Sequence, residues 1–228
     1  MPRSPAVSKE KMNKPMDVLI LVNGDLHLSP QLLQQSKNAD YIIAADGGAK
    51  HCVPLQLTPD ILIGDLDSIS GPLLKEFQNA GVEIQQYPVR KNATDLELAI
   101  DHAIAIGATK IFFAGMLGGR WDMSLANIFL LAHDKYKDIR FLLSGDNCVM
   151  HILHPGTHAL TTQIGQRVSL LPLKGNGENI SLTGFEYPLD QQTIPFGSSI
   201  GVSNVTVGTK VQIEHTGGIL LLVLSTCL

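Results

Sequence analysis

Two aspartates one residue apart, Asp65 and Asp67, directly follow the apolar run at 61–63. A short continuous apolar run is typical of a buried strand in a parallel sheet, and such sheets bind ligands just beyond the carboxyl ends of their strands. Two carboxylates this close repel each other unless a cation lies between them. Oxygen ligands suit a hard divalent ion such as Mg²⁺ carrying a nucleotide phosphate. The pair therefore indicates a metal site, with a solvated acidic turn as the alternative.

Four other segments place polar or glycine-rich residues at the same point, directly after a predicted strand. They are Asn23-Gly24-Asp25, Asp46-Gly47-Gly48-Ala49, Lys91–Asp95 and Gly115–Asp122. Because parallel strands present their carboxyl ends at one edge of a sheet, we expect all five turns to converge there. This convergence favours the metal-site interpretation of Asp65 and Asp67.

Thr94 and Asp95 have two interpretations. Thr94, with Glu97 three residues later, has the spacing of a capping box at the start of a helix. Asp95 would then only complement the positive end of that helix. Alternatively, Asp95 joins Asp65 and Asp67 around the metal. The neighbouring turns favour the second interpretation, with Mg²⁺ held by these three aspartates.

The segment Gly115–Asp122 has the composition of an anion-binding turn. Glycines let backbone N–H groups approach a phosphate closely, and the helix expected after them offers its positive end. Arg120 adds a planar fork that can hold phosphate oxygens at two points. The spacing matches neither a Walker A loop nor the dinucleotide fingerprint. Beside a carboxylate cluster, Gly118, Gly119 and Arg120 indicate a nucleotide-phosphate site.

These residues must be positioned by alternating strands and helices. We expect strands over 18–22, 41–45, 61–63, 82–87, 110–114 and 140–143, and helices near 30–37, 71–79, 95–106 and 122–135. This alternation predicts a parallel sheet covered on both faces. After residue 145 only short strands are expected, over 147–153, 156–160, 167–172, 180–183, 202–207, 210–215 and 219–224. Their spacing predicts an antiparallel sandwich.

The predicted fold class is therefore α/β, with an N-terminal Rossmann-like parallel-sheet domain and a C-terminal all-β sandwich domain. We place a loose tail at residues 1–15, the α/β domain at 16–145 and the β domain at 146–228. A chain of 228 residues that is 44% hydrophobic and contains 21 glycines suits one large or two modest compact domains.

Composition also excludes several partners. A net charge of −4 without a basic stripe argues against nucleic acid. The apolar runs are too short for a signal-peptide core or a membrane span, so no membrane is expected as a partner. Three widely separated cysteines are typical of reduced thiols in the cytoplasm. The eight histidines show no metal-ligand spacing and are expected in surface or packing roles.

Taken together, the motifs resemble the thiamine pyrophosphokinase (thiamine diphosphokinase) family. The resemblance covers residues 17–226 and rests, in the family's order, on Asp46–Ala49, Gly64–Ser68, Thr94-Asp95, Gly118–Asp122 and Ser203-Asn204. It implies an α/β catalytic domain, a β-sandwich domain, and a homodimer with thiamine bound where the subunits meet. It also implies transfer of pyrophosphate from Mg-ATP to thiamine, which yields thiamine diphosphate and AMP.

The resemblance also implies roles for individual residues. It assigns catalysis to Asp46, Asp65, Asp67, Asp95 and Arg120, with Asp46 orienting the substrate hydroxyl or a metal-bound water. Thiamine is assigned to Ser203 and Asn204. ATP is assigned to Gly47, Gly48, Ser68, Thr94, Gly118, Gly119, Arg120 and Asp122.

The chain departs from the family pattern at three places. Asn92 replaces an acid that is frequent before the Thr-Asp pair, Met123 replaces the usual histidine, and no aromatic residue lies near the C-terminus. Two alternative functions are another pyrophosphokinase, such as one acting on a hydroxymethylpterin, and a non-catalytic nucleotide or thiamine sensor. The β half with Ser203-Asn204 argues against the first, and the retained acids with Arg120 argue against the second.

Overall fold

The computed structural model describes residues 15–226, and its contacts divide them into two units. The α/β unit comprises the described residues up to 127 together with 138–144, and the β unit comprises 128–137 and 145–226. The predicted tail at 1–15 lies outside the described residues except for Pro15. Cys227 also lies outside them, and Cys52 and Cys148 are free thiols. Within residues 15–226, every helix is too short or too polar to cross a membrane.

The α/β unit contains the expected parallel sheet. Its strands are β1 (Met16–Leu21), β2 (Tyr41–Ala45), β3 (Ile61–Gly64), β4 (Glu83–Gln86), β5 (Ala108–Ala114) and β6 (Arg140–Gly145). They lie in the order β4-β3-β2-β1-β5-β6, and every neighbouring pair is parallel. From β1 the chain adds β2, β3 and β4 on one side and then β5 and β6 on the other. Consequently, all six strands end at one edge, and the order reverses between β1 and β5.

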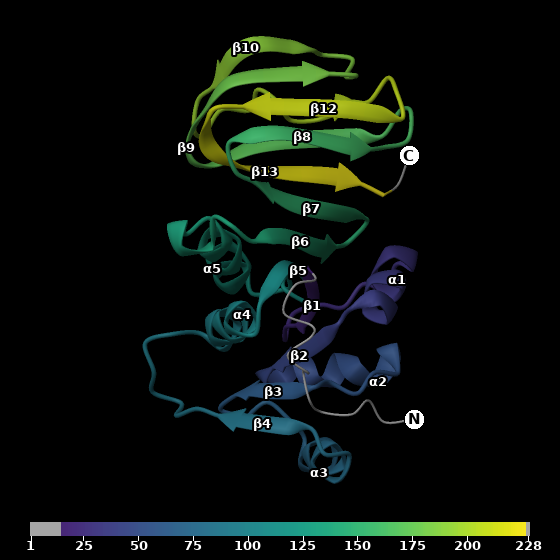
Figure 1. Cartoon of the computed structure of the whole chain (residues 1–228), viewed down its shortest axis with the longest axis vertical. Coiled ribbons are helices and arrows are strands. Elements are labelled where there is room, and N and C mark those ends of the chain that lie inside the picture. Colours follow the sequence, from purple (N-terminus) through teal and green to yellow (C-terminus); the bar gives the residue numbers. More distant parts are fainter. Residues whose placement is uncertain (1–14, 227–228) are drawn as a thin grey trace. The chain divides into compact units, whose positions relative to one another are not determined.

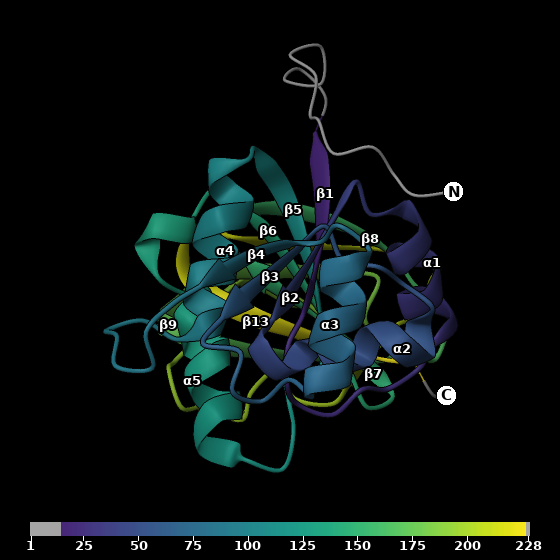
Figure 2. The ribbon, with the colours of Figure 1, turned by 90° about the horizontal axis from the view of Figure 1, so that it is seen from below.

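Helices cover both faces of this sheet. They are α1 (Pro30–Asn38), α2 (Cys52–Leu55), α3 (Gly71–Asn79), α4 (Asp95–Ala105) and α5 (Trp121–Leu131). In Figures 1 and 2, α1, α2 and α3 lie on one side of the strands and α4 lies on the other. Successive strand residues point to opposite faces. Leu19, Leu62 and Phe112 therefore pack with Phe77 of α3 on one face, while α4 contacts β1, β2, β3 and β5 on the other.

The β unit is built from antiparallel strands (Figure 1). They are β7 (Cys148–Leu153), β8 (Gly156–Thr161), β9 (Arg167–Thr183), β10 (Leu189–Ile194), β11 (Asn204–Val205), β12 (Lys210–His215) and β13 (Gly217–Ser225). β13 pairs with β7 and β9, and β12 pairs with β8 and β9. Alternate residues of these strands form a separate apolar core that includes Leu170, Ile180, Ile213 and Leu222.

Several elements differ from the sequence-based expectation, among them α2, which was not expected. The strands expected at 167–172 and 180–183 form one strand, β9, because the glycine-rich segment between them bulges while it pairs with β13. β10 was missed because most of its side chains are polar and exposed. β11 spans two residues instead of the six expected at 202–207. Helix α5 ends at Leu131, before 135, because His133 caps a separate 3₁₀ turn, η3 (Asp134–Tyr136).

Candidate active site at the carboxyl edge of the sheet

The turn after β3 brings Asp65 and Asp67 onto the same side of the chain. Leu66 between them has a left-handed backbone with φ of 68°, a conformation that a bulky residue rarely adopts. The Asp65 carboxylate accepts a hydrogen bond from the backbone N–H of Asp67 at 3.3 Å, and the Ser68 hydroxyl donates to the Asp67 carboxylate at 3.0 Å. The predicted ATP-binding residue Ser68 thus orients one of the two acids.

Asp46 joins this pair from the end of β2. One carboxylate oxygen each from Asp46, Asp65 and Asp67 lie within 4.8 Å of one another. Asp46 begins the 3₁₀ helix η2 (Asp46–His51) with φ of 43°, so its backbone is also left-handed. Gly64 makes room for it, since a Cβ at Gly64 would lie 2.9 Å from the Cβ of Asp46. Gly47 and Gly48, predicted to bind ATP, are buried in η2.

Asp46 is buried at 8% exposure, and its Oδ1 has no hydrogen-bond partner among the described residues. A buried, unpaired carboxylate oxygen is energetically costly unless a ligand satisfies it. Three clustered carboxylates supply the oxygen ligands that a hard divalent cation prefers. The residues present therefore fit a divalent metal ion.

Asp95 lies near the three acids, at the start of α4, but its carboxylate pairs with a lysine. The Thr94 hydroxyl accepts from the Glu97 N–H at 3.2 Å, so the N-cap expected from the sequence is confirmed. The Asp95 carboxylate lies 2.7 Å from the ammonium of Lys91, which also lies 3.9 Å from Asp65. The cluster of carboxylates within 4.8 Å thus includes Asp46, and Asp95 stands beside it against a lysine.

Burial raises the pKa of the Asp95 carboxyl group above its ordinary value of 3.8. Lys91 opposes this rise in pKa, whereas the negative charges of Asp46 and Asp65 add to it. The raised pKa of Asp95 therefore comes mainly from burial, because Lys91 lowers this pKa more than Asp46 and Asp65 raise it. A divalent cation in the pocket would favour the charged form of this carboxylate.

These acids line an open pocket of about 310 Å³ at the carboxyl ends of β1, β2 and β3. Its polar lining comprises Asn23, Asp46, Asp65, Lys91, Thr94, Asp95 and Asn127. Asn127 is buried, and its amide donates to the backbone carbonyl of Met116 at 2.9 Å. Met123, where the family pattern has histidine, also lines the pocket. Asp67, Ser68, Gly118, Gly119 and Arg120 lie outside this lining.

The turns after β1 and β5 are joined by short backbone hydrogen bonds. Gly24 donates to the carbonyl of Gly115 at 2.6 Å, and Asp25 donates to that of Leu117 at 2.7 Å. Gly115 has φ of 69°, and a Cβ there would lie 2.3 Å from the carbonyl oxygen of Val22, so no other residue fits this position. The two turns at the point where the strand order reverses are therefore fixed by close backbone approach.

The glycine-rich turn that leads into α5 presents Arg120 to solvent. The side chain of Arg120 is 74% exposed and lies 2.5 Å from the Asp122 carboxylate, which raises the pKa of Arg120 and lowers the pKa of Asp122. Gly118 is held by Ser124, whose hydroxyl accepts from its N–H at 3.1 Å. Gly119 is exposed, and a Cβ there would have no neighbour within 4 Å.

The predicted thiamine residues lie in the β unit in contrasting surroundings. Ser203 is exposed, with a left-handed φ of 59°. Asn204 is buried, and its amide oxygen accepts from the N–H groups of Tyr187 and Val205 while its amide nitrogen donates to the Tyr187 carbonyl. Asn204 thus ties β11 to the chain at Tyr187.

Sequence reasoning missed several residues of this edge. Lys50 donates to the backbone carbonyl and side-chain oxygen of Asn23, at 3.1 and 2.7 Å. His51 is buried and bonds the carbonyl of Gly24 at 3.0 Å, which agrees with the packing role expected of the histidines, and burial lowers its pKa. Their position directly after Asp46-Gly47-Gly48 was the available signal. Lys91 was likewise assigned no role although it begins the fourth polar turn.

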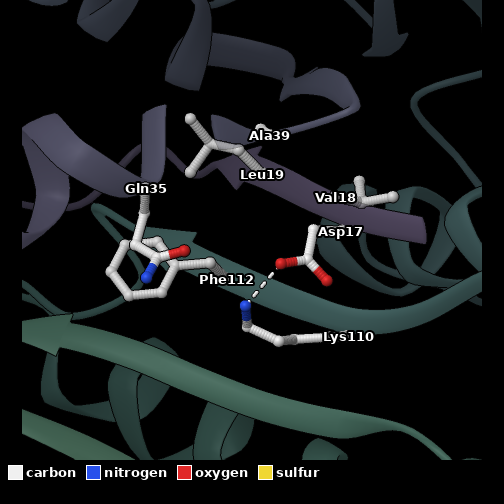
Figure 3. Close-up of a pocket in the computed structure, with 7 residues that line it drawn as sticks. All are labelled: Asp17, Val18, Leu19, Gln35, Ala39, Lys110 and Phe112. Carbon is white, nitrogen blue, oxygen red and sulfur yellow. Dashed lines mark hydrogen bonds and ion pairs between the residues drawn. The ribbon is translucent and has the colours of Figure 1, made fainter. Parts of the chain in front are cut away.

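A second hollow lies at the opposite edge of the sheet, where β1 and β5 begin (Figure 3). It has essentially no room for a water molecule, and Leu19 and Phe112 form much of its apolar wall. Lys110 and Asp17 close it with an ion pair of 2.5 Å. This hollow is a packing feature in which both charges are already matched.

Comparison with known proteins agrees with this geometry. Residues 32–143 match the family model "Thiamin pyrophosphokinase, catalytic domain", and residues 157–220 match "Thiamin pyrophosphokinase, vitamin B1 binding domain". The thiamine pyrophosphokinase of Bacillus subtilis is 28% identical over 208 residues, which cover 91% of this chain and 97% of that protein. Thiamine pyrophosphokinase 1 of Arabidopsis thaliana is 28% identical over 228 residues, with coverages of 89% and 84%.

Solved structures show the same relationship. The crystal structure of the Bacillus subtilis thiamine pyrophosphokinase superposes with a TM-score of 0.82 at 28% identity, covering 93% of this chain and all of that one. The Geobacillus thermodenitrificans structure gives 0.79 at 26%, with the same coverage. Yeast thiamin pyrophosphokinase, at 17% identity and a TM-score of 0.76, shares the fold. The chain therefore belongs to the thiamine pyrophosphokinase family.

Proposed function

We propose that this protein is a thiamine pyrophosphokinase, an enzyme that transfers the pyrophosphoryl group of ATP to the hydroxyl group of thiamine. The products are thiamine diphosphate and AMP. The observation that carries the proposal is the cluster of Asp46, Asp65 and Asp67, in which the buried Asp46 has an oxygen without a hydrogen-bond partner among the described residues. The match of residues 157–220 to the vitamin B1 binding domain favours thiamine over a pterin substrate.

The reaction depends on positioning more than on a protein nucleophile. The hydroxyl oxygen of thiamine attacks the β-phosphorus of ATP, and the bond from that phosphorus to the oxygen it shares with the α-phosphate breaks. Such transfers rely on alignment and charge neutralisation. Mg²⁺, when bound, neutralises negative charge on the phosphate oxygens. We assign its binding to Asp65, Asp67 and Asp95, with Asp46 as a neighbouring carboxylate.

The remaining residues of the edge have binding roles in this proposal. Arg120 and the backbone of Gly118 and Gly119 hold phosphate at the start of α5, supported by Asp122. Gly47, Gly48, Ser68 and Thr94 contribute to ATP binding. Asp46 orients the thiamine hydroxyl or a metal-bound water. The reversal of strand order between β1 and β5 favours a Rossmann-like arrangement, in which nucleotides bind at such a reversal.

We further propose that residues 16–145 form the catalytic domain and 146–228 a thiamine-binding β-sandwich, after a tail at 1–15. A homodimer would let the segment at Ser203 and Asn204 of one subunit complete the site of the other, with Ser203 exposed and Asn204 holding the segment in place. Helix α5 supports such an assembly, because Trp121, Leu125 and Phe129 recur every four residues on it and are 76%, 49% and 52% exposed. Large apolar side chains clustered at a surface are typical of protein interfaces. The separated cysteines favour a cytoplasmic location.

The test is an assay of AMP and thiamine diphosphate by chromatography, with ATP, thiamine and Mg²⁺ each omitted in turn. We expect the two products in equal amounts and only in the complete mixture. Asp65→Asn is the control for contaminating enzymes. AMP release that requires a hydroxymethylpterin instead of thiamine would establish the other pyrophosphokinase. Binding of both substrates without any AMP would establish the sensor.

A further inference from the structure

Lys91 is a basic side chain placed inside the acidic pocket. It belongs to the segment between β4 and α4, and its two chain neighbours, Arg90 and Asn92, are exposed. The Lys91 side chain is only 14% exposed, and its ammonium lies 2.7 Å from Asp95 and 3.9 Å from Asp65. Among the described residues that line the pocket, it is the only lysine or arginine, against Asp46, Asp65 and Asp95.

Helix stability does not account for this position. Lys91 lies just before the N-cap Thr94, at the positive end of α4, where anions stabilise a helix and cations destabilise it. Lysine also loses much side-chain freedom when it is ordered. The contacts that hold Lys91 in the pocket are those with the two acids, which are also proposed to hold a divalent ion.

A cation that binds these acids must compete with the lysine. The ammonium of Lys91 and a divalent ion attract the same carboxylate oxygens and repel each other. A nucleotide that arrives with the ion brings new acceptors, and lysine is a common phosphate ligand on a flexible four-carbon stem. The ammonium carries three N–H donors, so it can bond a phosphate oxygen without leaving the pocket.

We propose that Lys91 substitutes for the divalent cation between Asp65 and Asp95 in the empty site and then transfers its ammonium to a phosphate oxygen when metal and nucleotide bind. This inference deepens the proposed function and rests on it for the nucleotide. In the empty site the lysine keeps the carboxylates from repelling one another. In the loaded site it becomes a substrate-binding residue, and its charge adds to that of the metal on the transferred group.

The first experiment measures Mn²⁺ binding to the nucleotide-free protein by electron paramagnetic resonance of the free ion. Lys91→Met removes the competing charge, so we expect Mn²⁺ to bind about tenfold more tightly than to wild type. Lys91→Arg keeps the charge and should bind Mn²⁺ like wild type. Lys75→Met is the matched control, because Lys75 is an exposed lysine on α3. Unchanged or weaker Mn²⁺ binding by Lys91→Met would overturn the proposal.

The second experiment measures binding of α,β-methylene ATP, which cannot be cleaved at the bond that breaks in the reaction. With saturating Mg²⁺, Lys91→Met should bind this analogue about tenfold more weakly than wild type, as for a lost hydrogen bond to a charged group. A purely structural lysine would instead lower the melting temperature and leave analogue binding unchanged in the fraction that stays folded. That outcome would refute the phosphate role.

The two experiments also separate this inference from the proposed function. Neither Mn²⁺ nor analogue binding requires thiamine or turnover. If wild type released no AMP with thiamine, the proposed function would fail, while tighter Mn²⁺ binding by Lys91→Met would still support the competition. If AMP release were normal and Lys91→Met bound Mn²⁺ like wild type, only the role of Lys91 would fail.

Discussion

The α/β unit and the β unit differ in how a buried polar side chain is hydrogen-bonded. In the α/β unit, Oδ1 of the buried Asp46 has no hydrogen-bond partner among the described residues. In the β unit, the equally buried Asn204 makes three hydrogen bonds with the backbone of Tyr187 and Val205. A side chain whose bonds are supplied by its own chain maintains the fold, whereas one left without a partner needs a ligand. By this criterion Asp46 belongs to a ligand-binding site, whereas Asn204 is a structural support.

The largest expected effect is at the acidic pair after β3. Asp65→Asn or Asp67→Asn should lower kcat/KM for ATP about 1,000-fold, because the metal loses a charged ligand. Folding should not suffer, since removing one charge from a cluster of acids relieves repulsion. Steady-state kinetics and thermal melts check both halves of the prediction. Asp190→Asn, at an exposed position of β10, is the control and should behave like wild type.

The comparison is tested most directly at Asn204. If this side chain is a support, Asn204→Ala should lower the free energy of unfolding of the β unit by about 2–3 kcal/mol, since a buried amide with three bonds is lost. Urea unfolding followed by circular dichroism measures it. Ser203→Ala, at the exposed neighbour, should leave stability unchanged and raise the KM for thiamine. The comparison breaks if Asn204→Ala is as stable as wild type but has a raised thiamine KM, as expected from the sequence alone.

Arg120 tests whether an exposed residue outside the pocket lining acts on ATP. Arg120→Ala should lower kcat/KM for ATP about 10- to 100-fold, the usual cost of a lost bond to a charged group. Arg120→Lys should also be impaired, because an ammonium cannot form the two-point contact. The melting temperature should not change, since the side chain is 74% exposed. Wild-type efficiency in both variants would remove Arg120 from the proposed site.

The smallest effect concerns the pH dependence of metal binding. The folded pKa of Asp95 is raised above 3.8, so this carboxyl group takes up a proton at a higher pH than an ordinary one. Metal binding needs the charged form and should therefore weaken as the pH falls through that raised pKa. The same shift means that folding stability declines as the pH rises through it. Asp95→Asn should abolish this decline and melt at or above the wild-type temperature. A wild-type Mn²⁺ affinity that does not change between neutral pH and pH 4 would contradict the assignment.

Much of the α/β unit could be predicted from the sequence, because buried parallel strands are apolar runs and their turns carry distinct residues. The convergence of those turns followed from the geometry of a parallel sheet. The contacts that the acids make with one another and with Lys91 could not be predicted. The proximity of Asp46 to Asp65 depends on left-handed backbone at Asp46 and Leu66, which the pattern of the surrounding sequence does not indicate.

The β unit was harder to predict for a physical reason. Strand propensity depends on the neighbours that a strand packs against, so the polar β10 left no pattern and the bulged β9 was divided in two. Asn204 was recognised by its resemblance to a motif, but its hydrogen bonds to Tyr187 join residues 17 positions apart. A sequence motif can identify a residue, but it does not indicate whether the side chain's hydrogen bonds are already satisfied within the fold.

The pairing of β13 has a consequence for the order in which a ribosome releases the two units. β7 pairs with β13, with Cys148 opposite Ser225, and the long β9 also pairs with β13. The β unit therefore cannot complete its sheet until Ser225 has been made, whereas the sheet of the α/β unit is complete once β6 has been made. Domains generally fold as units during synthesis. We expect the nascent chain to acquire its acidic pocket well before the β unit becomes resistant to protease.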